Sequence, residues 1–310
     1  MQISDNMKLF FKKIGILFLS VIVVDLSLGH GLEYITSHIR VGGQGRDNYI
    51  ASETNEDLLV FGSSRAVHHY NTPMMDESLN MTCYNCGDDG SGIILSYGRL
   101  VMIKERYIPR IIIQDVNPDF DLLLDDNHKY LGWMKSHYKD ENIRSIFEDI
   151  DKTEKFKMAS FLYRYNSRFL QNVVTYITGM ANDGGNQGYR PLYGKIEKIH
   201  HRNNGEFKES YDFDSLKLKY VNKFIDLSKN SRLVFVVSPI WRGMDSLKLL
   251  PIKKICKERG IEFIDYSNCS KYVHNDKYFV DEIHLNSDGA NEFTKDLISE
   301  LRKKRKNHEI

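Results

Sequence analysis

The stretch Asp57–Arg65 reads DLLVFGSSR, and it decides the fold that we expect. Its apolar part, Leu58–Phe61, is an unbroken run that is typical of a strand buried on both faces of a parallel sheet. Gly62 allows a sharp turn, and Ser63 and Ser64 follow where a helix can begin. A serine at this point either caps the helix or is placed as a nucleophile, with helix N–H groups close to a developing oxyanion.

A second stretch near the C-terminus favours the nucleophile. Residues 281–290 read DEIHLNSDGA and precede the pattern of a final helix. Asp281 stands three positions before His284, so its carboxylate can reach the Nδ1–H of the imidazole and leave Nε2 free as a base. Ser64, His284 and Asp281 are therefore the predicted catalytic residues.

Together the two blocks resemble the SGNH (GDSL-like) hydrolase family. Gly62-Ser63-Ser64 matches the first block of that family with Ser63 in place of Asp, and the resemblance spans residues 57–303 in block order. It implies a doubly wound, flavodoxin-like parallel sheet and a serine esterase that needs no cofactor. The Ser63 variant and the apolar N-terminus look like the branch that acts on cell-envelope polysaccharides. That branch includes alginate O-acetylation proteins and the D-alanyl transfer protein of teichoic acid.

The resemblance also implies where an oxyanion would be held. Besides the N–H of Ser64, the second family block supplies a glycine N–H, for which Gly87 is the candidate and Gly90 the alternative. The third block supplies an asparagine, and Asn117 stands in its place, although the glycine and the following aspartate of the block are missing. Without the resemblance, Gly87 is part of a strand-to-helix turn and Asn117 begins a turn before Pro118.

The rest of the chain predicts an α/β fold with a parallel sheet of about five strands. Apolar strand patterns alternate with helix periodicity, which is the order that parallel sheets require. The carboxyl ends of such strands face the site, so we expect Trp241 and Arg242, after one strand, to bind substrate together with Arg65. The predicted strands and helices occupy residues 58–61, 66–80, 81–85, 93–107, 109–117, 214–229, 233–237, 246–259, 261–264 and 287–303.

The N-terminus predicts a membrane anchor. Lys8, Lys12 and Lys13 precede an apolar stretch, so residues 1–9 are expected in the cytoplasm and 10–29 in the membrane. A cleaved signal peptide is the alternative. Residues 30–55, which include a Gly-rich stretch, are expected to link the anchor to an extracytoplasmic domain, periplasmic or at the cell surface.

The domain is expected over residues 56–303, with an insertion at about 119–213 that shapes a cleft and a basic tail at 304–310. The formal net charge of +1 argues against a nucleic-acid partner. Cys83 and Cys86 have C-x-x-C spacing, but Cys256 and Cys269 do not repeat it, so no metal site is predicted. The adjacent His68 and His69 point in different directions on a helix and are interpreted as surface or wall residues.

These patterns predict an esterase that removes acyl groups, with acetyl the expected group, from an acylated carbohydrate or another ester. Two alternatives stay open. The same triad can serve an O-acyltransferase, in which a sugar hydroxyl replaces water. A non-catalytic envelope protein can also keep the fold to bind glycan or a membrane acyltransferase as its partner.

Overall fold

The computed structural model describes residues 5–181, 186–196 and 210–306. The chain forms two compact units. The first contains Met1–Asn48 and Leu131–Asn182, and the second contains Tyr49–Tyr130 and Asp183–Ile310. The expected insertion at 119–213 is therefore divided, because its middle part belongs to the same unit as the N-terminus.

The second unit is built on one parallel sheet of five strands in the order β2-β1-β3-β4-β5. This confirms the predicted α/β fold. The central strands are buried because their side chains are apolar on both faces, as in the run that opens the domain. The strands are β1 Leu58–Phe61, β2 Cys83–Asn85, β3 Ile111–Asp115, β4 Arg232–Val237 and β5 Glu262–Asp265.

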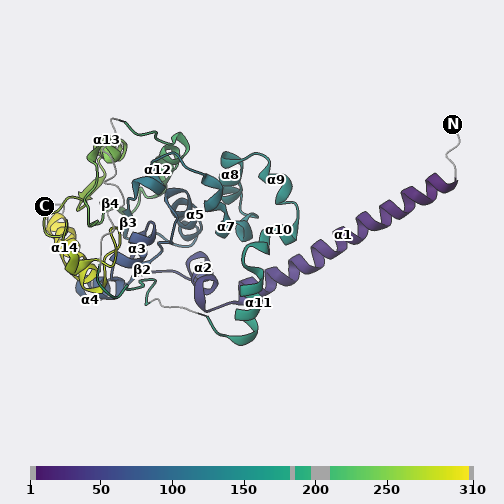
Figure 1. Ribbon diagram of the computed structural model, residues 1–310, viewed down its shortest axis with the longest axis horizontal. Helices are drawn as coiled ribbons and strands as arrows, with labels where there is room; N and C mark the ends of the chain where they lie inside the picture. The colour runs from purple at the N-terminus through teal and green to yellow at the C-terminus, as the bar shows by residue number, and fades with distance from the viewer. Residues whose placement is uncertain (1–4, 182–185, 197–209, 307–310) are drawn as a thin grey trace. The chain divides into compact units, whose positions relative to one another are not determined.

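Helices cover both faces of this sheet. In Figure 1, α14 and α4 lie on one side of the strands and α5 and α12 on the other. The main apolar cluster joins α14 to the sheet, with Phe293 and Leu297 fully buried against Val60 and Val236. The helices of this unit are α3 Ser64–His69, α4 Thr72–Leu79, α5 Ile93–Lys104, α6 Pro118–Asp121, η1 Asn127–Tyr130, α12 Ser215–Leu227, η4 Ser246–Leu249, α13 Leu250–Arg259, η5 Asp276–Tyr278 and α14 Ser287–Lys306.

The helix predicted at 66–80 is divided into α3 and α4, and the cause of the break is local. Asn71 caps the second part, α4, by accepting a hydrogen bond from the N–H of Met74 at 3.1 Å. Pro73 stands in the first turn, where its missing N–H costs nothing. α3 is therefore only 6 residues long, from Ser64 to His69.

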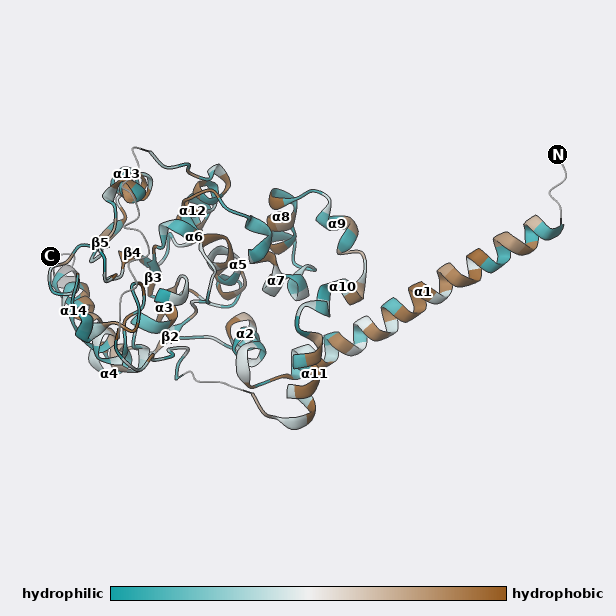
Figure 2. Cartoon of the chain, viewed as in Figure 1, coloured by the Kyte–Doolittle hydropathy of each residue, from teal (hydrophilic) through white to brown (hydrophobic). Residues whose placement is uncertain are grey.

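The first unit is helical. Its longest helix, α1 Asp5–His38, packs against α10 and α11, and Figure 2 shows the apolar residues that run along α1. The remaining helices are α7 Leu131–Met134, η2 Lys135–His137, α8 Glu141–Ile150, α9 Glu154–Lys157, α10 Phe161–Tyr165, η3 Asn166–Arg168 and α11 Phe169–Thr178. The helix α2 Gly42–Ser52 follows α1 and ends in the second unit.

The predicted transmembrane helix at 10–29 is not supported. Among the residues that the structure describes, no helix combines the length and the apolar character that a membrane span needs. Asp25, inside the expected span, has a carboxylate that accepts hydrogen bonds from the N–H groups of Phe161 and Leu162 at 2.9 and 3.2 Å. From Asp25 onward α1 is thus part of the folded unit.

Residues 30–55, the expected linker, are largely helical. They consist of the end of α1 and the whole of α2, joined by a turn. Asn48 donates hydrogen bonds to the carbonyls of Thr36 and Ile39, at 2.8 and 2.9 Å, and so ties the two helices together. The glycines serve close packing rather than flexibility, because a Cβ on Gly45 would stand 2.3 Å from the carbonyl carbon of Arg40.

Candidate active site

The turn after β1 presents Ser64 at the start of α3. Gly62 has a φ of +140°, and a Cβ there would meet the carbonyl oxygen of Asp115 at 2.8 Å, so only glycine fits. Ser63 follows as the N-cap residue, but its hydroxyl makes no capping hydrogen bond. The capping interpretation therefore does not hold for Ser63, and Ser64 is the first helical residue, partly exposed.

The structure brings together the three residues predicted to be catalytic. The Oγ of Ser64 lies 2.8 Å from Nε2 of His284. On the other side of the ring, Nδ1 lies 2.9 Å from Oδ2 of Asp281. The carboxylate accepts a hydrogen bond from the Nδ1–H group, so Nε2 has a free lone pair that accepts a hydrogen bond from the hydroxyl of Ser64. This chain of contacts can remove a proton from Ser64 as it attacks a carbonyl carbon.

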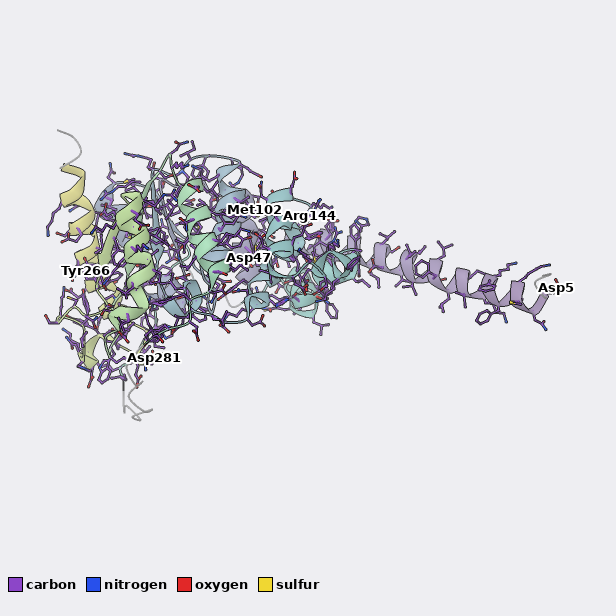
Figure 3. All side chains as sticks on the ribbon, turned by 90° about the horizontal axis from the view of Figure 1, so that it is seen from above. Asp5, Asp47, Met102, Arg144, Tyr266 and Asp281 are labelled. Carbon is purple, nitrogen blue, oxygen red and sulfur yellow. The ribbon has the colours of Figure 1, made fainter. Side chains whose placement is uncertain are left out.

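Asp281 is itself fixed by the loop that it begins. Its Oδ1 accepts hydrogen bonds from the N–H groups of Ile283 and His284, both at 2.8 Å. Burial alone would raise the pKa of Asp281, but the His284 ring and these N–H groups lower it below its usual value. The side chain is 54% exposed, compared with 23% for His284, and Figure 3 shows Asp281 at the margin of the molecule.

Asn117 lies near the nucleophile, at the end of β3. Its Nδ2 donates to the hydroxyl of Ser63 at 3.3 Å, and its Oδ1 accepts from the N–H of Asp119. The backbone N–H of Asn117 donates to the carboxylate of Asp121 at 2.6 Å. The side-chain amide is thus held next to Ser63 and has a second hydrogen for another acceptor.

Gly87 is placed differently from what its expected role requires. Its N–H donates to Oδ1 of Asn85 at 3.0 Å, so this N–H already has an acceptor. A Cβ on Gly87 would stand 2.7 Å from that of Ala66, which gives the glycine a packing role against α3. The alternative, Gly90, has a φ of +68° and open space around its Cα. The oxyanion role of either glycine stays a prediction.

Arg65 does not face a substrate, so this prediction is wrong. The side chain is 1% exposed, because it turns into the domain and pairs with Asp115, with Nε 3.4 Å from Oδ2. The guanidinium also donates to the carbonyl of Val116. Oδ1 of the same aspartate accepts the hydroxyl of Tyr70 at 2.8 Å and the N–H of Ser238 at 3.0 Å. With His69, which contacts Ser238, the residues Arg65, Tyr70, Asp115 and Ser238 form what we call the buried polar cluster.

Trp241 and Arg242 lie against the loop that carries Asp281 and His284. The N–H of Trp241 donates to the carbonyl of Glu282 at 3.1 Å, and its indole Nε1 donates to Asp276 at 2.7 Å. Arg242 lies 3.4 Å from the carboxylate of Glu282. Both residues therefore support the loop, and their contact with substrate stays a prediction.

The two adjacent histidines of α3 have more specific places than a surface or wall. Nδ1 of His68 donates to the carbonyl of Arg190 at 2.6 Å, and the ring centroid lies 5.7 Å from that of His284. His69 is fully buried, which the sequence did not indicate. Nothing in the sequence pattern of α3 distinguishes the two histidines.

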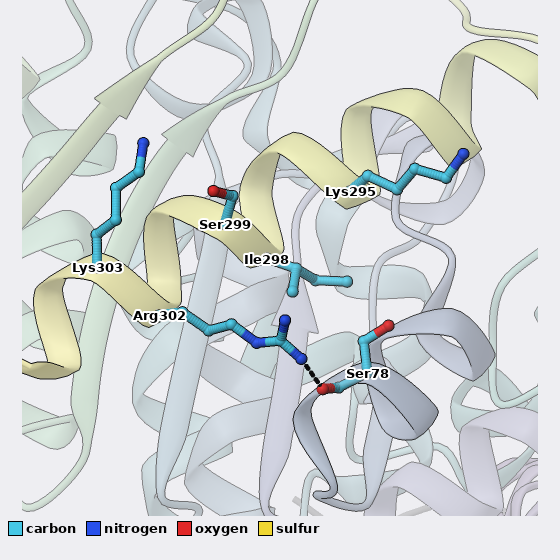
Figure 4. A pocket seen from close by; sticks show the side chains of 6 residues that line it. All are labelled: Ser78, Lys295, Ile298, Ser299, Arg302 and Lys303. Atoms are coloured by element: carbon cyan, nitrogen blue, oxygen red, sulfur yellow. Dashed lines mark hydrogen bonds between the residues drawn. The ribbon is translucent and has the colours of Figure 1, made fainter.

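A separate pocket lies on α14, away from these residues. It has a volume of about 410 Å³, and Figure 4 shows its lining residues Ser78, Lys295, Ile298, Ser299, Arg302 and Lys303. Its cations already have partners, because Arg302 donates to the carbonyl of Ser78 and the two lysines pair with glutamates of their own helix. We do not regard it as the active site.

Comparisons with known proteins add the following. No family model and no curated protein matches the chain. A solved structure described as a "putative acylhydrolase" from Bacteroides fragilis NCTC 9343 is 14% identical, with a TM-score of 0.36, over 86% of this chain and 97% of that one. The acetyl xylan esterase Est2A from the rumen bacterium Butyrivibrio proteoclasticus is 10% identical, with a TM-score of 0.36, over 80% of this chain and 63% of that one.

Proposed function

We propose that the second unit is a serine esterase of the SGNH type. The observation that carries the proposal is the unbroken contact from Ser64 through His284 to Asp281 at the carboxyl edge of a parallel sheet. A helix cap needs none of these contacts, and a binding module has no use for all three residues in this order.

The reaction would proceed in two steps. Oγ of Ser64 attacks the ester carbonyl carbon and gives its proton to Nε2 of His284, which then passes it to the departing alkoxide. Water enters, loses a proton to the same nitrogen and attacks the acyl-serine, and His284 returns the proton to Oγ. Asp281 orients the ring and stabilises the imidazolium between these transfers. The N–H of Ser64 and the amide of Asn117 are the proposed oxyanion donors.

The proposed substrates are acyl esters on carbohydrate, with acetyl as the expected acyl group. The substrate proposal rests on the sequence resemblance to the family branch that acts on envelope polysaccharides. An O-acyltransferase, the alternative activity, would use the same triad. The two activities differ in the acceptor. Release of free acetate from an acetylated glycan, without acetylation of an added glycan, would support the esterase.

A fluorophosphonate probe tests the central claim on the full chain. We expect the wild type to be labelled at Ser64, and Ser64→Ala and His284→Ala to lose labelling while they remain folded. Ser78→Ala and His128→Ala serve as controls for serine and histidine residues outside the site. A folded wild type that stays unlabelled, or labelling that survives in Ser64→Ala, would refute the assignment.

A further inference from the structure

His69 is the last residue of α3, the helix that Ser64 begins. Its side chain has no exposed surface. A buried imidazole must find partners for both ring nitrogens, because an unpaired polar group away from water is costly. Its two partners lie on different elements: one follows β4, and the other follows the catalytic histidine.

The hydrogen bonds of His69 determine its tautomer. Nε2 lies 3.0 Å from the backbone nitrogen of Leu285, which can only donate, so Nε2 is the acceptor. Nδ1 lies 3.0 Å from Oγ of Ser238, so Nδ1 has the proton and donates it. Only the neutral ring, protonated at Nδ1, makes both bonds.

The N–H that His69 accepts belongs to the peptide that joins His284 to Leu285. The carbonyl of this peptide accepts the N–H of Val280 at 3.0 Å, so the peptide is held from both sides. The N–H of His284 itself donates to Asp281. Among these three hydrogen bonds at the main chain of His284, one connects it to α3, the helix that begins with Ser64. This is the bond that the N–H of Leu285 donates to His69.

We propose that His69 is a positioning residue that fixes the main chain of His284 with respect to Ser64, so that the imidazole and the nucleophile keep their hydrogen bond. This rests on the proposed esterase function. Because both Ser64 and His69 belong to the rigid helix α3, a shift of the helix moves the nucleophile and the support of its base together.

The charged groups around His69 keep it neutral. Burial is the largest cause that holds its pKa well below the usual value, and electrostatic interactions with His284, Arg65 and His68 act in the same direction. Asp115 is the carboxylate of the buried polar cluster. It is connected to His69 through Ser238, which donates its N–H to Asp115 and accepts a hydrogen bond from His69 with its hydroxyl. A neutral His69 also avoids placing a second positive charge 6.3 Å, ring to ring, from the imidazolium that His284 forms during the reaction.

Two substitutions of His69 distinguish the loss of the hydrogen-bond acceptor from the loss of the volume that the ring fills. His69→Leu keeps an apolar volume but leaves the N–H of Leu285 without an acceptor, and we expect the rate of fluorophosphonate labelling to fall by about 10²-fold. His69→Gln can place an amide oxygen near the position of Nε2, and we expect it to recover most of that rate. The pH midpoint of labelling should move in His69→Leu and return in His69→Gln.

Thr294→Val is the matched control. The Thr294 hydroxyl is buried and donates to the carbonyl of His69 at 3.3 Å, so its loss disturbs the same residue without touching the ring. We expect it to lower the melting temperature but to keep the labelling rate and pH midpoint. If Thr294→Val and His69→Leu lose rate equally at equal stability, or if folded His69→Leu keeps the wild-type rate, the role is purely structural and the proposal fails.

A second measurement does not depend on activity. In the folded wild type, ¹⁵N NMR should show His69 as the Nδ1–H tautomer without titration between about pH 5 and 8, and the His284 signals should change in His69→Leu. Titration of His69 in that range would overturn the proposal. An unlabelled wild type would refute the esterase instead, and the NMR result would still decide whether His69 holds His284.

Discussion

His284 and His69 differ in almost every respect except their proximity. The side chain of His284 is 23% exposed, and its partner Asp281 is 54% exposed. His69 and the aspartate of its cluster, Asp115, are completely buried. The exposed pair belongs to the proposed active site, whereas the buried polar cluster joins α3 to the ends of β3 and β4.

The difference separates two uses of the same residue types. In the exposed pair, solvent screens the charges and the interaction contributes little to the stability of the fold. Stability therefore places little demand on which residues stand at these two positions. In the buried cluster each polar atom must keep its partner, because the loss of one leaves another uncompensated. We therefore expect substitutions in the pair to change rates and substitutions in the cluster to change stability. His69 is the exception, because it also holds the main chain of His284 and its loss should change the rate as well.

The largest effect is expected for His284→Ala. Without the base, the rate of ester hydrolysis or labelling should fall by about 10⁴-fold or more. The free energy of unfolding should change by less than about 1 kcal/mol, because the side chain is partly exposed. Kinetics with an activated ester and urea unfolding measure the two quantities. A stability loss of several kcal/mol would remove the distinction between the two regions.

Asp115→Ala should have the opposite profile. It leaves the guanidinium of Arg65 buried without its carboxylate and removes the acceptor for Tyr70 and Ser238, so we expect a loss of about 3–5 kcal/mol in urea unfolding. Asp281→Ala is the control for removal of an aspartate from the exposed pair, with an expected loss of about 1 kcal/mol or less. Equal losses in the two variants would contradict the comparison.

Asn117 follows β3 and contacts Ser63, the residue before Ser64. Its variants sharpen the comparison between the exposed pair and the buried polar cluster. If its amide holds the oxyanion, Asn117→Ala should lower kcat by about 10²–10³-fold with little change in KM. Ser63→Ala removes the hydroxyl to which the amide donates at 3.3 Å. If Asn117 serves only that hydroxyl, the two variants will lose the same activity. A much larger loss in Asn117→Ala would assign the amide to the transition state.

The sheet could be predicted from the sequence because buried parallel strands have a local signature. Each of the runs at 58–61, 111–113 and 233–237 is apolar over consecutive positions, which only a strand covered on both faces requires. The residue types of the triad were recognisable from two short blocks. That Ser64 and His284 meet could not be known, because 220 positions separate them.

The errors have physical causes that a local pattern does not contain. Arg65 follows the nucleophile and was assigned to the substrate, since arginine is almost never fully buried unless it is paired. Its partner, Asp115, is supplied by a different strand. The Gly-rich composition within 30–55 predicts a linker, but the glycines of α2 allow close packing of a helix. The extracytoplasmic location stays a prediction from the sequence alone.

The smallest expected effect is a dependence of stability on pH that comes from His69. Its pKa in the folded state is lowered, so the unfolded chain takes up a proton below about pH 6.5 and the folded chain does not. The stability that His69 contributes is therefore complete above that pH and is lost as the pH falls. From pH 8 to pH 5 the loss should be about 2 kcal/mol.

Asp121 opposes this dependence, so the test must compare two proteins. Burial raises the pKa of Asp121 to about 7, which means that its contribution is present at low pH and is lost as the pH rises. Urea unfolding of the wild type and of His69→Gln at the same pH values cancels this effect. The difference in unfolding free energy should fall by about 2 kcal/mol between pH 8 and pH 5. A constant difference would mean that His69 takes up its proton in the folded state, which would place a charged ring behind His284 and make the two histidines alike.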